Sequence, residues 1–427
     1  TPSNIKYFLK NTVFYIPLKI REFKEIQKDN RELKDKNTKI ILENNILKNK
    51  LYQGSYDVIT KDEYLFQSFV VPFTSEKNPN FSKSKAYLEV FKDKIIIFFW
   101  SGKIIYFEKN NYEKEFFSFE EIKNNISQKN FFDNNIKWTG IRDALIVDNK
   151  IYLSLTEEIG KNCYMTSVIR ADLNFNNLKF TNIFKPLECT DISKQVEYFR
   201  YFNGHQTGGR LIKFNNRIYL TIGDYNTWEY VQDDKSIIGK VIEINPDNGE
   251  YKIVTKGHRN QQGLAVFSEE EKILISSEHG PKGGDEINLI DLKENPETNN
   301  FGWPISSYGD HYDVVPINKF TKKYAPLNKS HEEYNFKEPI KYFNKAIAPS
   351  QIIRNNFSNQ NQFILSTLGK KSLFFLEIND LNDVEIINII DTGNRIRDII
   401  YDQSSDSYFM YQEHSNMPKV VKISKMN

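Results

Sequence analysis

The sequence of 427 residues has little cysteine, only two residues, and no excess of charge of either sign. Its 58 Lys and Arg residues stand against 56 Asp and Glu residues, a net charge of +2. So small a net charge provides no field that would select nucleic acid or an anionic membrane surface as a partner, and we expect no nucleic-acid partner. The sequence also lacks the run of roughly 18 apolar residues that a membrane helix needs. The nearest stretch, residues 13–20, is interrupted by Pro17 and Lys19.

The composition is that of a globular protein with a large core, because 39% of the residues are hydrophobic and 14% are aromatic. One large domain with an appendage is therefore expected. The chain starts at Thr1 rather than Met, so a removed export signal or an anchor upstream of Thr1 remains open.

The two cysteines, Cys163 and Cys189, flank a predicted β-hairpin. Its apolar strands are residues 164–173 and 178–184, and its polar turn is residues 174–177. Antiparallel pairing brings both cysteines to the same end, so a disulfide is geometrically reasonable and would imply an oxidising compartment. Two unrelated buried thiols are the alternative.

The N-terminal segment, residues 1–52, contains an unbroken heptad repeat from Phe23 to Leu51. This repeat predicts an α-helical coiled coil, and asparagine at consecutive a positions is a known means of setting register in parallel helices. We therefore expect a homo-oligomer formed through this segment. A single amphipathic helix lying on its own domain is the alternative. The a positions are Phe23, Asn30, Asn37, Asn44 and Leu51, and the d positions are Ile26, Leu33, Ile40 and Leu47.

Residues 53–427 show an all-β pattern of short apolar strands separated by Asn, Asp and Gly turns. Four segments repeat the plan of strand, tight polar turn and strand, and the regions 263–290 and 349–378 bring the number to about six units. This predicts a six-bladed β-propeller, with a double sandwich as the alternative. The four segments are LEVFKDKIIIFFW from Leu88, ALIVDNKIYLSL from Ala144, RLIKFNNRIYLTIGD from Arg210 and DIIYDQSSDSYFMY from Asp398.

Eight motifs from residue 204 onward resemble, in order, those of the soluble glucose/sorbosone or aldose sugar dehydrogenases. These proteins are six-bladed propellers that use pyrroloquinoline quinone (PQQ) and calcium. The resemblance covers approximately Leu88 to the C-terminus. The motifs are GHQTGGRL (204–211), YLTIGD (219–224), GKVIEINPDNG (239–249), GHRNQQGLA (257–265), SEHGPKGGDEINLI (277–290), NNFGWP (299–304), AIAPS (346–350) and NRIRD (394–398).

The resemblance implies a calcium site in the glycine-rich loop HGPKGGDE, with the main-chain oxygens of Gly280 and Pro281 as ligands. Asp285 and Glu286 lie beside them and are predicted to belong to the same site. Glycine-rich loops present carbonyls and carboxylates to a hard cation, which here would polarise the quinone carbonyl.

The resemblance also implies a set of cofactor-binding side chains. Arg395 and Arg397 alternate with an apolar residue, so a strand would project both toward the carboxylates of PQQ. Asn260 and Gln262 match amides that bind the cofactor from the channel wall. The family's lysine near the quinone is represented by Lys370, displaced by one position because Gly369 follows Leu368.

His205 is the predicted general base, which takes the proton of the anomeric hydroxyl while hydride passes to the quinone. It stands five residues before Arg210 rather than the family's four, where Gln206 is found. A one-residue bulge, allowed by Gly208 and Gly209, would restore it to the site. A further departure is the start of the second blade, glutamine-bearing in the family, which reads KWTGIRD at residues 137–143.

The sequence therefore predicts a PQQ-dependent dehydrogenase that oxidises an aldose or related sugar and passes electrons to an external acceptor. The expected location is periplasmic or extracellular. The alternative is a catalytically inactive propeller that serves as an oligomeric binding or assembly module, which would explain the departures. A propeller hydrolase would need a central calcium held by carboxylates from several blades, and no such set is evident.

Overall fold

A computed structural model describes residue 36 and residues 57–71, 85–113, 119–127, 139–193, 202, 204–358, 361–380, 383–414 and 417–426. The chain divides into two units, Thr1–Gln53 and Gly54–Asn427. Apart from Lys36, the heptad repeat of Phe23–Leu51 lies outside the described residues, so the coiled coil and the oligomer stay predictions. No helix in the described ranges is long and apolar enough to cross a membrane.

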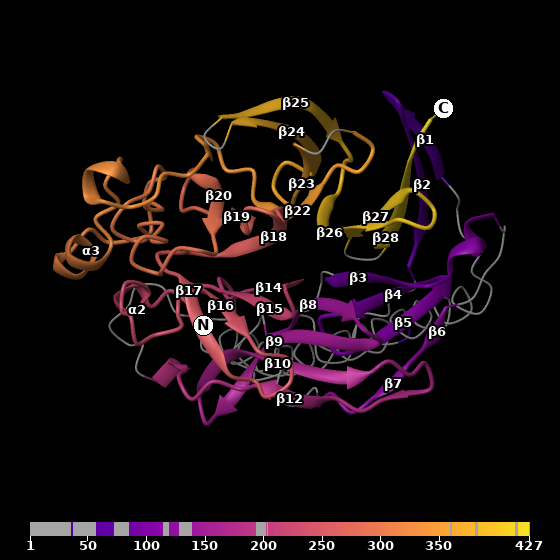
Figure 1. Cartoon of the computed structure of the whole chain (residues 1–427), viewed down its shortest axis with the longest axis horizontal. Helices are drawn as coiled ribbons and strands as arrows, with labels where there is room; N and C mark the ends of the chain where they lie inside the picture. The colour runs from indigo at the N-terminus through magenta and orange to yellow at the C-terminus, as the bar shows by residue number, and fades with distance from the viewer. Residues whose placement is uncertain are drawn as a thin grey trace, which may run out of the picture. The chain divides into compact units, whose positions relative to one another are not determined.

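The second unit is all-β and consists of six antiparallel blades, which confirms the predicted propeller (Figure 1). The first three blades follow one another along the chain. The first blade consists of β3 (Ala86–Phe91), β4 (Lys94–Phe99), β5 (Ile104–Glu108) and β6 (Glu120–Glu121). The second consists of β8 (Gly140–Val147), β9 (Lys150–Gly160), β10 (Cys163–Asp172) and β12 (Thr181–Phe184), with β13 (Thr190–Asp191) also paired to β10. The third consists of β14 (Gly208–Phe214), β15 (Arg217–Ile222), β16 (Lys240–Ile244) and β17 (Tyr251–Thr255).

The last three blades complete the sequence of sheets. The fourth blade consists of β18 (Gln261–Ser268), β19 (Ile273–Glu278), β20 (Asp285–Asp291) and β21 (Lys341–Phe343). The fifth consists of β22 (Pro349–Arg354), β23 (Gln362–Thr367), β24 (Ser372–Asp380) and β25 (Asp383–Asp391). The sixth consists of β26 (Arg395–Asp402), β27 (Ser407–Glu413), β28 (Lys419–Lys425), β2 (Tyr64–Val70) and β1 (Asp57–Lys61). The smaller elements are β7 (Lys123–Asn124) paired in parallel with β11 (Asn177–Leu178), and the short helices η2 (Lys109–Glu113), α2 (Trp228–Val231), α3 (Lys319–Tyr324) and η5 (Glu332–Tyr334).

Tight polar turns form the predicted hairpins. Asp148 and Asn149 both have positive φ, 51° and 58°, and connect β8 to β9. Asn215 and Asn216, with φ of 48° and 58°, connect β14 to β15 in the same way. Two successive left-handed residues give a turn whose twist matches that of the strands, and Asn and Asp tolerate this conformation best after glycine.

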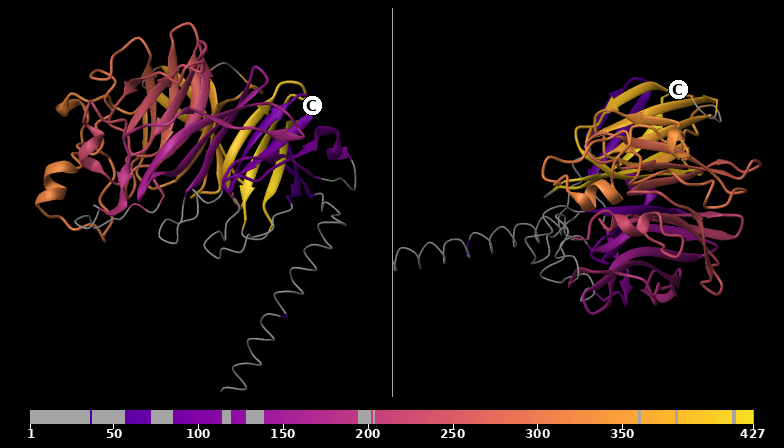
Figure 2. Two further views of the ribbon diagram at one scale, coloured as in Figure 1. Left: turned by 90° about the horizontal axis from the view of Figure 1, so that it is seen from below. Right: turned by 90° about the vertical axis from the view of Figure 1, so that its left-hand side faces the viewer.

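The ring closes through strands that are far apart in sequence. Strand β2 pairs with β28 from Tyr64↔Lys425 to Val70↔Lys419, so the first strands of this unit complete the last blade (Figures 1 and 2). The first strand of each blade is innermost and contacts the first strands of both neighbours, in the cyclic order β3, β8, β14, β18, β22 and β26. Each innermost strand is an edge strand of its sheet, so only these short edges face the propeller axis.

Apolar side chains between neighbouring blades form the core, as Leu153, Leu220 and Ile275 illustrate by being fully buried. At the outer side of the second blade, Cys163 and Cys189 form a disulfide with their Cα atoms 5.4 Å apart. Cys163 also pairs with Asp191, across β10 and β13. The predicted disulfide is therefore present, and the alternative of two separate thiols is wrong.

A buried ion triad joins the innermost strands near the propeller axis. Arg210 lies 2.8 Å from both Asp143 and Asp398, and all three are at most 4% exposed. The second oxygen of Asp143 accepts from the Leu211 backbone N–H at 2.7 Å, and that of Asp398 accepts from the Leu88 N–H at 2.8 Å. The triad thus connects the first, second, third and sixth blades.

Candidate functional site

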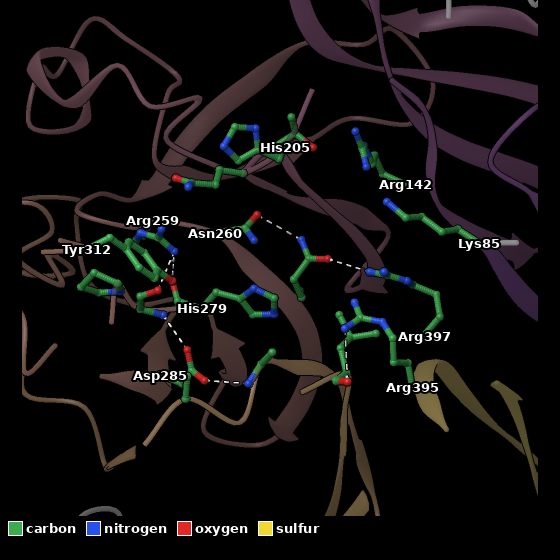
Figure 3. A pocket seen from close by; sticks show the side chains of 18 residues that line it. Lys85, Arg142, His205, Arg259, Asn260, His279, Asp285, Tyr312, Arg395 and Arg397 are labelled. Atoms are coloured by element: carbon green, nitrogen blue, oxygen red, sulfur yellow. Dashed lines mark hydrogen bonds between the residues drawn. The ribbon is translucent and has the colours of Figure 1, made fainter. Parts of the chain in front are cut away.

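A cavity of about 360 Å³ lies at the amino ends of the six innermost strands (Figure 3). Its volume falls within the range of ligand-binding pockets, roughly 300–1,000 Å³. Five cationic and three amide side chains belong to its lining. The lining residues are Lys85, Arg142, His205, Gln206, Thr207, Arg259, Asn260, Gln262, His279, Gly280, Pro281, Asp285, Tyr312, Ala346, Ala348, Leu368, Arg395 and Arg397.

β-bulges direct several of these side chains into the cavity. Near the start of β8, β18 and β26 the pairing register skips Arg142, Gln262 and Arg397 respectively. Bulges of the same kind interrupt β14 between Gly208 and Leu211, and β22 between Pro349 and Ile352. A bulged residue is released from strand alternation and can be aimed differently from its neighbours, and bulges are common beside active sites.

His205 lines the cavity, and a bulge follows it on β14, between Gly208 and Leu211. Gln206 has a φ of 57°, in the left-handed region, and lines the cavity beside it. The Nε2 atom of His205 lies 3.0 Å from Nδ2 of Asn226. The ring of Phe202 stacks near the imidazole, with centroids 6.5 Å apart and planes at 11°. The backbone turn and these two contacts fix the position of the imidazole.

A buried amide network lies behind His205. With its amide oriented to suit its neighbours, Gln206 donates to Asp224 at 2.7 Å and to the Asn226 side-chain oxygen at 2.9 Å, and it accepts from Arg259 at 3.0 Å. The other oxygen of Asp224 accepts from the Trp303 indole N–H at 2.9 Å. Burial raises the pKa of Asp224 to about 6, although Arg259, the Asn226 backbone N–H and the Trp303 indole N–H oppose the rise. The network connects Arg259 to the neighbours of His205.

The predicted cofactor amides lie on the cavity wall and connect three blades. The Asn260 side-chain oxygen accepts from the Gly208 backbone N–H at 3.2 Å and from the Gln262 amide at 3.1 Å. The Gln262 oxygen in turn faces Arg397 at 3.5 Å. Both amides therefore lie between the histidine segment and the arginine pair.

Arg395 and Arg397 both reach the cavity from β26, as the sequence predicts (Figure 3). Each forms an ion pair with Glu413 on β27, at 2.9 Å and 2.6 Å respectively. Burial opposes ionisation of Glu413, but Arg397, Lys85 and Arg395 lower its pKa overall. The single carboxylate of Glu413 thus pairs with two guanidinium groups.

The predicted metal loop has a different hydrogen-bond pattern from that of a carboxylate-rich metal site. Both oxygens of Asp285 accept backbone N–H groups, of Gly280 at 2.9 Å and of Ile347 and Ala348 at 2.7 Å (Figure 3). The Gly280 carbonyl accepts from Arg259 at 2.6 Å. Asp285 therefore holds the loop together, which explains its position without a metal ion.

Glu286 is not among the lining residues, because it follows Asp285 on β20 and successive strand residues face opposite sides. Burial raises the pKa of Glu286 well above its ordinary value, and Glu278 raises it further. No group of three or more His, Cys, Asp or Glu side chains that could hold a metal ion occurs among the described residues. Of the predicted ligands, only Gly280, Pro281 and Asp285 reach the cavity.

Lys370 is exposed in the turn between β23 and β24 and does not line the cavity. The N–H groups of Gly369 and Lys370 both donate to the Ile347 carbonyl, at 3.0 Å and 3.1 Å, and this turn presents Leu368 to the cavity instead. The displacement caused by Gly369 thus moves the lysine out of the site.

Two further cations in the lining, Lys85 and Arg142, were not predicted from the sequence. Arg142 belongs to the segment KWTGIRD, and its entry into the cavity depends on the bulge of β8, which strand alternation in the sequence does not predict. Lys85 immediately precedes β3, and none of the sequence motifs includes it.

The family model described as "Glucose / Sorbosone dehydrogenase" matches residues 146–420. The aldose sugar dehydrogenase YliI of Escherichia coli K12 is 27% identical over 264 residues, which cover 56% of this chain and 67% of that protein. Quinoprotein glucose dehydrogenase B of Acinetobacter calcoaceticus is 35% identical over 137 residues, covering 25% of this chain and 27% of that protein.

Solved structures show the same fold. The apo-form of the soluble aldose sugar dehydrogenase from Escherichia coli superposes with a TM-score of 0.62 at 19% identity, over 80% of this chain and 96% of that one. The PQQ-bound form of an aldose sugar dehydrogenase from Streptomyces coelicolor superposes with a TM-score of 0.54 at 14% identity, over 84% and 98% of the two chains.

Proposed function

Because the chain belongs to the glucose/sorbosone dehydrogenase family and is a sugar dehydrogenase, we propose that its cavity binds PQQ and that the protein oxidises a sugar with it. In this proposal the bound quinone would supply the hydride acceptor, and the electrons would go on to an external acceptor. The relatives favour this function over the inactive binding module. The observation that carries the proposal is the concentration of cationic and amide side chains around one cavity at the propeller axis.

The donor set fits a polycarboxylated cofactor. Arg395 and Arg397 present guanidinium groups, which bind carboxylates with paired hydrogen bonds, and Asn260 and Gln262 add amides on the adjoining wall. Arg259 adds a further cation between the amide network and the glycine-rich loop. These five residues would hold PQQ, which accepts the hydride when bound.

The donor set fits a calcium ion less well. Gly280 and Pro281 offer main-chain oxygens at the cavity, but the Gly280 oxygen accepts a hydrogen bond from Arg259 and both oxygens of Asp285 accept from the backbone. Calcium prefers six to eight oxygen ligands. We therefore assign no step to a metal ion.

His205 acts as the proton acceptor in this proposal. It lies at the cavity surface, where a sugar hydroxyl can reach it, and Asn226 and Phe202 hold its ring in place. Removal of the hydroxyl proton by a positioned base assists transfer of the hydride. The amide network of Gln206 keeps Asn226 in place and so positions the base indirectly.

We also propose that the protein works in the periplasm or outside the cell. The disulfide between Cys163 and Cys189 supports this location, because such bonds persist in oxidising compartments.

The experiment compares cofactor binding with turnover in two variants. Arg395→Ala/Arg397→Ala should weaken PQQ binding by about 100-fold or more, since each charge-assisted hydrogen bond contributes about 1.5–3 kcal/mol. His205→Ala should bind PQQ nearly as the parent does but lose about 100- to 10,000-fold in turnover. Quinone absorbance and dye reduction measure the two effects.

Lys213→Ala/Arg217→Ala is the matched control, because it also removes two cations but from the β14–β15 hairpin, where they pair with Asp148 and Glu243. It should leave both measurements unchanged. A parent protein that binds no PQQ, with or without added calcium, would contradict the proposal.

A further inference from the structure

The cavity has a second cationic wall that the proposed cofactor contacts do not use. Lys85 and Arg142 come from the first and second blades, whereas Arg395 and Arg397 come from the sixth (Figure 3). The single carboxylate side chain among the described lining residues is Asp285, whose oxygens accept three backbone N–H groups. Cationic side chains therefore outnumber carboxylates among the described lining residues.

Arg142 is built rigidly into this wall. It is the bulged residue of β8, its Nε atom donates to the Thr156 hydroxyl at 3.0 Å, and another of its nitrogens donates to the Gly204 carbonyl. Gly204 directly precedes His205, so the guanidinium lies next to the segment that carries the proposed base. A group bound by Arg142 would therefore lie close to the proposed base.

Lys85 lies at the junction between this wall and the arginine pair. Its Nζ atom lies 4.5 Å from the centre of the Trp100 ring. Burial lowers the pKa of Lys85 well below its ordinary value, and Arg397, Arg142 and Arg395 add to this effect, while Glu413 opposes it. A bound anion would relieve the repulsion among these cations.

We propose that the substrate of this site is an anionic sugar, bearing a carboxylate or a phosphate, and that Arg142 together with Lys85 binds its anionic group. Guanidinium is suited to both groups because it offers paired donors in a plane. The proposal deepens the proposed function and rests on it for the reaction, but sugar binding can be measured without turnover. Arg142 and Lys85 are then specificity-determining residues, and a neutral aldose offers no anionic group for them to bind.

The test measures binding of matched sugars to the full chain by calorimetry, in the presence and absence of PQQ. The probes are glucose, glucuronate and glucose 6-phosphate, with galactose, galacturonate and galactose 6-phosphate as a second set. At least one anionic sugar should bind about tenfold or more tightly than its neutral counterpart, since a charge-assisted contact is involved. The carboxylate and phosphate arms distinguish the two forms of the anionic group.

Substitutions of Arg142 and Lys85 test whether these residues cause the preference for anionic sugars. Arg142→Gln and Lys85→Gln should each reduce the ratio of anionic to neutral affinity, and Arg142→Lys should retain part of it. Lys213→Gln, which removes a cation paired with Asp148 on the far end of β14, should leave the ratio unchanged. Circular dichroism of each variant verifies that it is folded.

Three results would overturn the inference: no anionic sugar of either set binds more tightly than its neutral counterpart; Arg142→Gln weakens all sugars equally; or Arg142→Gln weakens PQQ binding while the sugar preference persists. The last result would assign these cations to the cofactor. Failure of the proposed function is distinct, because it is the absence of PQQ binding or of dye reduction with every sugar.

Discussion

Replacement of Arg210 by Met should destabilise the propeller strongly. Arg210 is 4% exposed and lies 2.8 Å from both Asp143 and Asp398. Its removal leaves two buried carboxylates facing each other without a cation. Breaking a buried ion pair by removing one partner typically costs about 3–5 kcal/mol, and we expect the free energy of unfolding to fall by about that amount at pH 8.

The loss should depend on pH. Burial already raises the pKa of Asp143 to about 7, with Arg210 lowering it and Asp398 raising it. Without Arg210 the carboxyl holds its proton to higher pH in the folded state than in the unfolded chain, so the variant loses stability as pH rises. Near pH 5 one of the two carboxyls is protonated in the folded variant, and the loss should be smaller.

Urea unfolding followed by tryptophan fluorescence at pH 5 and pH 8 measures both effects. Arg217→Met is the control, since the Arg217 side chain is 42% exposed and pairs with Glu243 at the surface, and it should cost at most about 1 kcal/mol. Replacing all three residues, Arg210→Met with Asp143→Asn and Asp398→Asn, should recover part of the loss. A loss below about 1 kcal/mol at pH 8, or an equal loss at both pH values, would refute the reasoning.

Two further predictions concern the disulfide and Asp224. Alkylation of the unreduced, denatured protein should label neither Cys163 nor Cys189, and Cys163→Ser/Cys189→Ser should lower the free energy of unfolding by about 2–5 kcal/mol; labelling of both cysteines would contradict this. Because the folded pKa of Asp224 is about 6, above its ordinary value of 3.8, its contribution to stability is fully present below about pH 4 and is lost as pH rises through 6, by about 3 kcal/mol. Asp224→Asn should remove this part of the pH dependence in thermal unfolding, and an unchanged dependence would show that another group is responsible.

The blades could be predicted from sequence because their hairpins are local. The segments around Asp148 and Asn215 combine apolar strands with residues that accept positive φ, and the structure has a hairpin at both. The closure of the ring could not be predicted in this way. Strand β2 pairs with β28 across almost the whole unit, and its alternating burial pattern is compatible with any partner strand. Only the requirement that the last blade be completed selects this pairing.

Site residues could be predicted where one sequence motif includes both the functional side chain and the backbone segment that positions it. Arg395, Arg397, Asn260 and Gln262 all line the cavity, as does His205. Of the two carboxylates beside the glycine-rich loop, Asp285 lines the cavity and Glu286 does not, and the sequence does not distinguish a carboxylate that accepts backbone N–H groups from one that binds a metal. Asp285 accepts three N–H groups, two of them from the loop before β22, which lies more than 60 residues further along the chain.

The bulges explain why the cationic wall could not be predicted, and they also connect the site to the stability of the ring. Arg142 and Arg397 line the cavity, while the residues that follow them, Asp143 and Asp398, are the two carboxylates of the buried triad with Arg210. Each bulge inserts one residue, so the cavity side chain is added to the strand without displacing its structural neighbour from register. Strict strand alternation, by contrast, would predict which residues face the cavity only from whether their position in the strand is odd or even. Substitution of a cavity cation can therefore change binding while the triad one residue away keeps the blades together.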